Sequence, residues 1–390
     1  LKRWLVNFSE EFDLDENINL IAQFNRVSDS KYFKEIDRNN TDKRALDSFI
    51  KYSNKDEKEN LYFHILLEDE QLVNDGTPEY TRAFEGAVSK TLNSKEIMPI
   101  QLDFATTRFA HDTSSKESGT RSHGKVKVSR KLKIQYPKIT PNANVSITNY
   151  SLKNNSNFNR TIFGSGLVFD FSTSKKSSLF GYQANHKVIP KITYNFRQKK
   201  AQGNIPLFDT TDKYDSLISF SDLTSGERYT GLDRITNAND IILSLESKYR
   251  KVGALKDDND LLSMKIAQAY FADDEVVSNS PNINYESRKS YSDVAASIDM
   301  AVDDFIFNSD VQFNPDKSRI VKKRNTISYS PSSRQFISLS FIDDGTKETE
   351  RFYGAYPITD SFHIFGGLDK TTSTGFTNSE TTGIAYESCC

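Results

Sequence analysis

The sequence predicts an all-β protein, a large antiparallel transmembrane β-barrel. Three observations support this fold class. Apolar and polar residues alternate with a period of two along most of the 390 residues, as they do in strands whose two faces meet different surroundings. Such segments recur roughly 19 times, while helical periodicity is nearly absent. Phe, Tyr and Trp make up 12% of the chain, which suits the aromatic girdles of membrane barrels.

Bulk composition excludes some classes of protein and leaves others open. The net charge of −2 and the pI of about 6.3 give no global basic field that would attract nucleic acid. The mean hydropathy of −0.61 and 27% charged residues would also suit a soluble protein. No apolar run is long enough for a transmembrane helix. A search for long apolar runs does not detect barrel strands, because the alternation of apolar and polar residues keeps their average hydropathy low.

The clearest alternation predicts a strand over residues 125–136. Its apolar face carries Val, Leu, Ile and Tyr. Its other face carries a cationic row, Lys125, Lys127, Lys131 and Lys133. The same pattern then recurs over residues 142–148, 240–246, 298–303, 305–313 and 337–341.

The long irregular segments are informative as well. Pro190 cannot donate to a strand ladder, so we expect it at a strand end or bulge. Residues 198–236 form the longest stretch without alternation. A loop of that length inside a compact domain is usually functional. Short connections such as 356–360 and long polar ones such as 251–260 favour a barrel, and no fixed-period repeat indicates a propeller or a solenoid.

Residues 229–239 contain a "GLDRI" run followed by "AN", the most specific of several short motifs. The other motifs lie in residues 1–6, 26–33, 119–121, 188–194, 355–360 and 386–390. In this order, they resemble the LptD family of lipopolysaccharide (LPS) assembly proteins of the outer membrane.

The resemblance implies a function that alternation does not show. Members of this family insert LPS into the outer leaflet of the Gram-negative outer membrane. Their barrel of about 26 strands opens sideways at a lateral gate, holds an LptE-like lipoprotein plug, and receives LPS from a periplasmic LptA-like bridge through an N-terminal jellyroll. We expect residues 1–390 to be a single barrel domain that is incomplete at both ends, without the jellyroll, the first strands and the last strands.

The two cysteines of the chain are adjacent, at Cys389 and Cys390. Neighbouring Cα atoms lie about 3.8 Å apart, below the usual disulfide range, so a bond between them would be strained. They resemble family cysteines that form disulfides with cysteines outside this chain, in the oxidising periplasm. Free thiols of no consequence are the alternative.

Two further sets of residues are candidate site residues. The lysine row would face the lumen and attract LPS phosphates, or it would be an ordinary solvated interior. Asp233 and Arg234 lie in the run that resembles an inward-folding loop in contact with the plug. The alternative is a turn that these two residues hold locally.

No catalytic or metal-binding constellation is predicted. The five histidines are scattered, and no His-x-x-x-His or Cys-x-x-Cys spacing occurs. We therefore predict transport rather than enzymatic function, without a cofactor. The rival interpretations are a generic porin or receptor barrel, which should lack the paired cysteines and the "GLDRI" run, and a soluble β-rich adhesin, which should fold without detergent.

Overall fold

The computed structural model describes residues 2–36, 43–93, 98–113, 116–255, 259–274, 277–278, 289–332 and 334–387. Within these ranges, twenty strands form one antiparallel sheet, against roughly 19 expected from alternation. The all-β prediction is confirmed. No helix in the described ranges is long and apolar enough to cross a membrane.

The first strands follow one another through short turns and longer loops. They are β1 Leu5–Asp15, β2 Ile18–Val27, β3 Ala45–Asp56, β4 Leu61–Leu72, β5 Thr81–Leu92, β6 Ile100–Ala110, β7 Gly119–Ser129, β8 Lys138–Leu152 and β9 Asn157–Asp170. A short helix, α1 (Tyr32–Glu35), lies between β2 and β3.

The remaining strands continue the same order. They are β10 Thr173–Leu179, β11 Tyr182–Arg197, β12 Ala238–Lys251, β13 Leu262–Phe271, β14 Val294–Val302, β15 Phe305–Asn314, β16 Arg319–Ser332, β17 Gln335–Asp343, β18 Glu348–Pro357, β19 Phe362–Thr371 and β20 Phe376–Tyr386. A 3₁₀ turn, η2 (Lys213–Asp215), and a helix, α2 (Phe220–Ser225), lie between β11 and β12.

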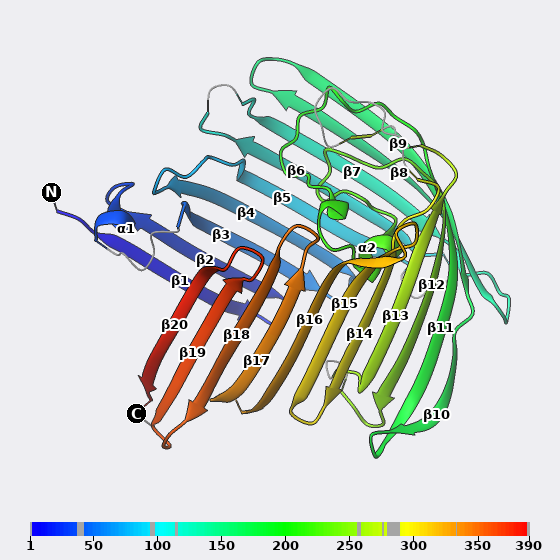
Figure 1. Cartoon of the computed structure of the whole chain (residues 1–390). Helices are drawn as coiled ribbons and strands as arrows, with labels where there is room; N and C mark the ends of the chain where they lie inside the picture. Colours follow the sequence, from blue (N-terminus) through cyan, green and yellow to red (C-terminus); the bar gives the residue numbers. More distant parts are fainter. Residues whose placement is uncertain are drawn as a thin grey trace.

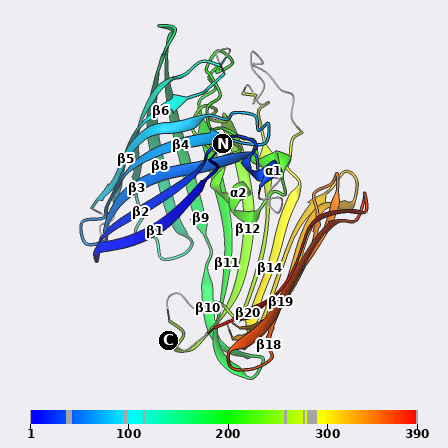
Figure 2. The same ribbon diagram turned by 90° about the vertical axis from the view of Figure 1, so that its left-hand side faces the viewer.

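The sheet curves strongly, from β1 (blue) to β20 (red) in Figure 1. Figure 2 shows β1 to β6 and β18 to β20 as two walls on opposite sides, with α2 on the inner side of the curve. Among the described residues β1 pairs with β2 alone and β20 with β19 alone. These two strands are therefore the edges of the sheet as described.

One interruption in the ladder explains the position of a proline. The first half of β11 pairs with β10 and the second half with β9. Pro190 lies at this change of partner, where its carbonyl oxygen accepts from the N–H of Phe171 at 3.0 Å. In an antiparallel strand, the N–H and C=O of one residue point to the same side. The N–H group that Pro190 lacks would point to the same side as its carbonyl oxygen, where the ladder is already interrupted.

The two faces of the sheet differ in polarity, as alternation predicts. In β12, Ile241, Leu243 and Leu245 are exposed on the outer face, while Asp240 and Ile242 are buried on the inner face. Ile337, Leu339 and Phe341 of β17 repeat the exposed apolar row. An apolar outer face with a mainly polar inner face is the arrangement of a barrel wall in a membrane.

Candidate functional site

Residues 198–237, here called the inner segment, connect β11 to β12 and fold against the inner face of the sheet. The expected irregular stretch is therefore real, but it has its own structure. Ser219 and Asp222 form a capping box at the start of α2, and Gly226 ends the helix in the left-handed region at φ +67°. Asp212 and Tyr229 form an isolated antiparallel bridge that closes the middle of the segment.

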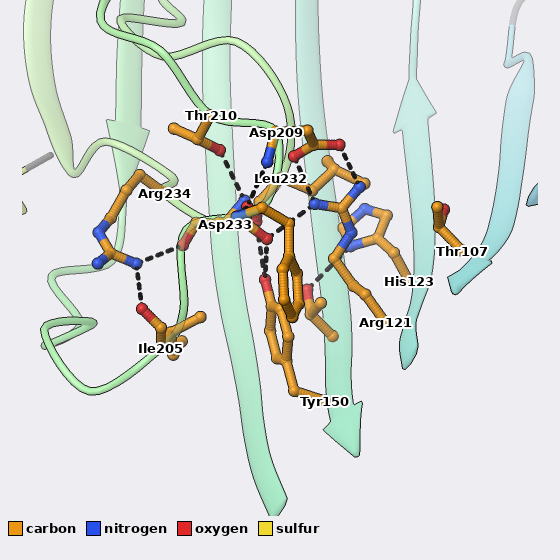
Figure 3. A network of polar contacts seen from close by, with 12 residues as sticks. Thr107, Arg121, His123, Tyr150, Ile205, Asp209, Thr210, Leu232, Asp233 and Arg234 are labelled. Carbon is orange, nitrogen blue, oxygen red and sulfur yellow. Dashed lines mark hydrogen bonds and ion pairs between the residues drawn. The ribbon is translucent and has the colours of Figure 1, made fainter. Parts of the chain in front are cut away.

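The carboxylate of Asp233 is the centre of the contact between the inner segment and the strands (Figure 3). Its Oδ1 accepts from Nη1 of Arg121 at 2.8 Å and from the hydroxyl of Tyr150 at 3.1 Å. Its Oδ2 accepts from the backbone N–H groups of Phe208 at 2.6 Å and Asp209 at 3.1 Å. The side chain is fully buried, and four donors satisfy its two oxygens.

Arg121, on β7, binds two carboxylates of the inner segment. Besides Asp233, it holds Asp209 in a bidentate pair, with Nη1–Oδ1 and Nη2–Oδ2 distances of 2.6 Å. Its guanidinium also lies 4.8 Å from the ring centre of Phe109. The guanidinium of Arg121 holds the pKa of Asp209 below its ordinary value against the opposing effect of burial. Burial raises the pKa of Asp233, and Arg121 opposes this rise.

Arg160, on β9, binds the backbone of the same turn. It donates to the carbonyl oxygens of Leu232 at 2.5 Å and Asp233 at 3.0 Å, and to Oε1 of Gln202 at 2.5 Å. Buried carbonyl groups need such partners, because an unsatisfied one costs free energy comparable to a lost hydrogen bond. Arg160 therefore fixes the path of the backbone, while Arg121 fixes the side chain of Asp233.

Arg234 points away from the carboxylate of Asp233, toward Ile205 (Figure 3). Its Nη1 donates to the carbonyl oxygen of Ile205 at 2.9 Å, and its Nε to that of Ser278 at 2.8 Å. Both Asp233 and Arg234 are buried within the chain's own strands and loops, so in this conformation they present little surface to another protein. The inward fold of this segment is seen. Contact with a plug stays a prediction.

The neighbouring glycine allows the close approach of the two halves of the inner segment. Gly231 has φ +61°, a region that favours glycine. A Cβ atom at this position would also lie 2.7 Å from the carbonyl oxygen of Asp209. Gly231 thus allows the turn before Asp233 to approach the backbone of Asp209 closely.

A second contact joins the inner segment to the later strands. Ile218 and Leu223 pack with Ile242, Ala267, Ala269 and Ala295 in one buried apolar cluster. Lys322, on β16, donates to the carbonyl oxygens of Tyr214, Asp215 and Ser216 at 3.3, 2.9 and 2.8 Å. The segment therefore contacts β7 to β9 through residues near its two ends and β12 to β16 through its middle, residues 214–223.

The lysine row is shorter than predicted. Strand β7 ends at Ser129, so the interpretation of residues 125–136 as one strand is wrong in its second half. Lys131 and Lys133 lie beyond the strand, where the chain turns through Pro137 toward β8, and both are exposed. Lys125 and Lys127 are partly buried and line two different cavities next to the inner segment.

Cys389 and Cys390 lie outside the described residues. In the part of the chain that is described, no three His, Cys, Asp or Glu side chains are grouped so that they could hold a metal ion. His123 contacts Thr148 at 2.9 Å, and His64 contacts Glu85 at 2.9 Å.

Arg121, Tyr150, Arg160 and Asp209 are functional candidates that the sequence did not reveal. One signal was present, because Arg121 has the same parity in β7 as Lys125 and Lys127 and therefore faces inward. The partner of an inward arginine, however, comes from a segment 88 or 112 residues away. Alternation carries no information about such a distant contact.

A wide antiparallel sheet with an apolar outer face and a polar, arginine-rich inner face defines the class of transmembrane β-barrel proteins. Comparison with known families then identifies the particular one. The model of the LptD family, described as "LPS transport system D", matches residues 2–354. The chain belongs to the LptD family, and the fold and family together indicate the outer membrane.

Curated relatives agree with this assignment along the whole chain. The LPS-assembly protein LptD of Shewanella sp. (strain MR-4) is 24% identical over 421 residues, with 100% of this chain and 52% of the relative covered. The protein of the same name in Nitrosomonas eutropha is 24% identical over 394 residues, with 94% and 52% covered. The chain thus spans about half the length of the curated relatives that it matches.

Solved structures show a more distant similarity. The siderophore receptor PirA from Pseudomonas aeruginosa is 11% identical with a TM-score of 0.48, and the match covers 97% of this chain and 76% of the receptor. The ferric enterobactin receptor PfeA from the same organism has a TM-score of 0.35, with 95% of this chain and 62% of the receptor covered.

Proposed function

We propose that this chain is the barrel part of a protein that transports LPS to the outer membrane and assembles it there. The observation that carries the proposal is the family match over residues 2–354, together with relatives named LPS-assembly proteins along the whole chain. The role is transport without covalent chemistry.

The polarity of the two faces supports this role. LPS combines an apolar lipid with an anionic, sugar-rich head. The inner face offers cations such as Lys125 and Lys127, which attract phosphate groups. The outer face offers exposed apolar side chains such as Leu243 and Phe341 to the membrane. A path for LPS along the inner face would match its head with polar groups.

The partners follow from the same proposal. An LptE-like lipoprotein would sit inside the barrel as a plug, and a periplasmic LptA-like bridge would deliver LPS in a Gram-negative cell. Cys389 and Cys390 would form disulfides with cysteines outside this chain and fix the delivery domain to the barrel. The inner segment covers part of the inner face, so a plug would have to lie beside it.

Site-specific photo-crosslinking in cells tests the proposed path. A photoreactive residue replaces Lys127 in one strain and the adjacent Val128 in another, in the full-length protein that contains this chain. Lys127 lines an inner cavity, and its neighbour in β7 points to the opposite face. We expect LPS adducts at position 127 to exceed those at position 128.

The failure of this experiment has a clear meaning. Equal or absent adducts at both positions would remove Lys127 from the path. If a photoreactive residue at the inward positions 125, 144 and 193 also gave no LPS adduct, the chain would be an ordinary porin or receptor barrel.

A further inference from the structure

A cavity of about 250 Å³ lies between the inner face of β7 to β9 and the inner segment. Lys125 and Asn144 line it from the strands, Glu227 and Arg234 line it from the segment, and Arg197 lines it from the end of β11. The cavity adjoins the turn that Arg121 and Arg160 hold, so its walls are built from groups that are already fixed.

No salt bridge joins the buried Arg234 to a carboxylate in the described part of the chain, although the charge of Asp233 lies nearby. Only 2% of Arg234 is exposed, and its Nε and Nη1 donate to backbone carbonyl groups. Its Nη2 has no hydrogen-bond partner among the described residues. A buried charge that lacks a counter-ion, and a buried donor that lacks an acceptor, each cost free energy. Arg234 is among the residues that line the cavity, so an anion bound there would place a counter-charge next to it.

Lys125 adds a second cation, and no salt bridge joins it to a carboxylate in the described residues. Its cross-strand neighbour Asp103 instead accepts from Ser89 at 2.6 Å and from Gln101 at 3.1 Å. The remaining charges of the cavity wall cancel, because Arg197 pairs with Glu227 at 2.8 Å. Among the residues that line the cavity, the cations that no salt bridge joins to a described carboxylate are therefore Lys125 and Arg234.

We propose that this cavity is a binding site for one phosphate group, held by Arg234 and Lys125. Arginine and lysine are the residues that proteins use most for phosphate, through charge-assisted hydrogen bonds. The volume is below the roughly 300–1,000 Å³ of sites for drug-sized ligands, so the cavity takes a phosphate group rather than a whole lipid. The group would come from a phosphorylated lipid, which rests on the proposed function, or from free phosphate.

Equilibrium dialysis with radiolabelled inorganic phosphate tests the site in the full-length protein in detergent. Lys125→Gln removes one cation without disturbing a hydrogen bond of the inner segment. Lys131→Gln is the matched control, because Lys131 is an exposed lysine beyond the end of β7. We expect one phosphate per chain, at least tenfold weaker binding in the Lys125→Gln variant, and a change below twofold in the control.

A second variant and a folding assay distinguish loss of the binding site from loss of the fold. Arg234→Lys retains the charge but lacks the planar fork of donors, so it should also weaken binding. Heat-dependent mobility on gels reports whether each variant is folded. The proposal is overturned if the folded wild-type protein binds no phosphate at millimolar concentration, or if Lys125→Gln and Lys131→Gln have equal affinities.

Competition then identifies the source of the phosphate group. Diphosphorylated lipid A in micelles should displace the labelled phosphate, while the same lipid without phosphates should not. If phosphate binds but neither lipid displaces it, the site takes free phosphate and the lipid source is excluded. The crosslinking at position 127 is a separate measurement, so failure of the transport proposal is distinguishable from failure of this site.

Discussion

A single buried carboxylate, that of Asp233, connects the inner segment to the strands. Arg121 and Tyr150 approach it from β7 and β8, and two backbone N–H groups approach it from the segment itself. Buried ion pairs add little net stability when they are complete, but removing one partner leaves the other charge uncompensated. A substitution that removes only the charge of Asp233 should therefore lower the stability of the folded protein.

Asp233→Asn keeps the shape of the side chain and removes its charge. Arg121 keeps Asp209 as a partner, so we expect a loss near the lower end of the range for a broken buried pair, about 3 kcal/mol. The measurement is the temperature at which the protein loses its folded, fast-migrating form on a gel. Asp215→Asn is the control, because Asp215 is exposed in the same segment. Equal transition temperatures for the two variants would show that Asp233 does not anchor the segment.

Substitution of Gly231 tests whether a steric clash of the added Cβ atom increases the cost of backbone strain. Gly231→Ala places a Cβ in the left-handed region, which costs about 1–2 kcal/mol, and also against the carbonyl group of Asp209. Gly253→Ala is the control, since Gly253 has φ +83° with nothing within 4 Å of the added atom. We expect a larger fall in transition temperature for Gly231→Ala. Equal falls would mean that strain alone explains the effect and that the turn adapts to the Cβ.

At the scale of elements, the inner segment is held near its ends by β7 to β9 and in its middle by β12 to β16. The ammonium group of Lys322 uses its three donors on three successive carbonyl groups, those of residues 214–216. These carbonyl groups lie around the 3₁₀ turn η2, where the backbone has few bonds of its own. Lys322 thus acts as a cap supplied by strand β16.

Lys322→Met should release the middle of the segment and leave the sheet intact. We expect limited proteolysis of the detergent-solubilised protein to cleave near residues 214–216 several times faster than in the wild type. Lys323→Met is the control, because Lys323 is the next residue of β16 and points to the opposite face. If both variants are cleaved at the wild-type rate, the three bonds of Lys322 do not hold the segment.

The elements differ in how far the sequence could predict them. The alternation in β12 and β17 predicted both faces, because membrane and interior impose opposite polarity on successive residues. The strand over residues 125–136 was overextended, since Lys131 and Lys133 keep the parity after β7 has ended. The contacts of Arg121 with Asp209 and Asp233 could not be predicted, because local periodicity says nothing about which distant loop returns to an inward side chain.

At the scale of the whole molecule, the inner segment links two parts of one curved sheet. It contacts β7 to β9 through Asp233 and β12 to β16 through α2 and Lys322. Neighbouring strands hold each other by ladders, so the sheet does not depend on the segment for its order. The segment instead reduces the open space on the inner side of the curve.

Deleting the inner segment should show whether the sheet needs the segment to assemble, or whether the segment only reduces the open space on the inner side. Arg197 and Ala238 are directly paired at the end of the β11–β12 ladder, so a two-residue Asn-Gly turn can replace residues 198–237. The fourteen residue pairs of that ladder remain, and we expect the full-length protein still to assemble in the outer membrane. Because the inner side is then less obstructed, cells should become more permeable to polar antibiotics that are too large for ordinary porins.

The control for this deletion keeps the segment and weakens one of its anchors. Cells with Asp233→Asn should show a smaller rise in antibiotic uptake than cells with the deletion, because the α2 cluster and Lys322 still hold the middle of the segment. Unchanged uptake in the deletion strain, with normal amounts of assembled protein, would mean that the segment does not obstruct the interior. Loss of the assembled protein would instead show that the ladder between β11 and β12 needs the segment to form.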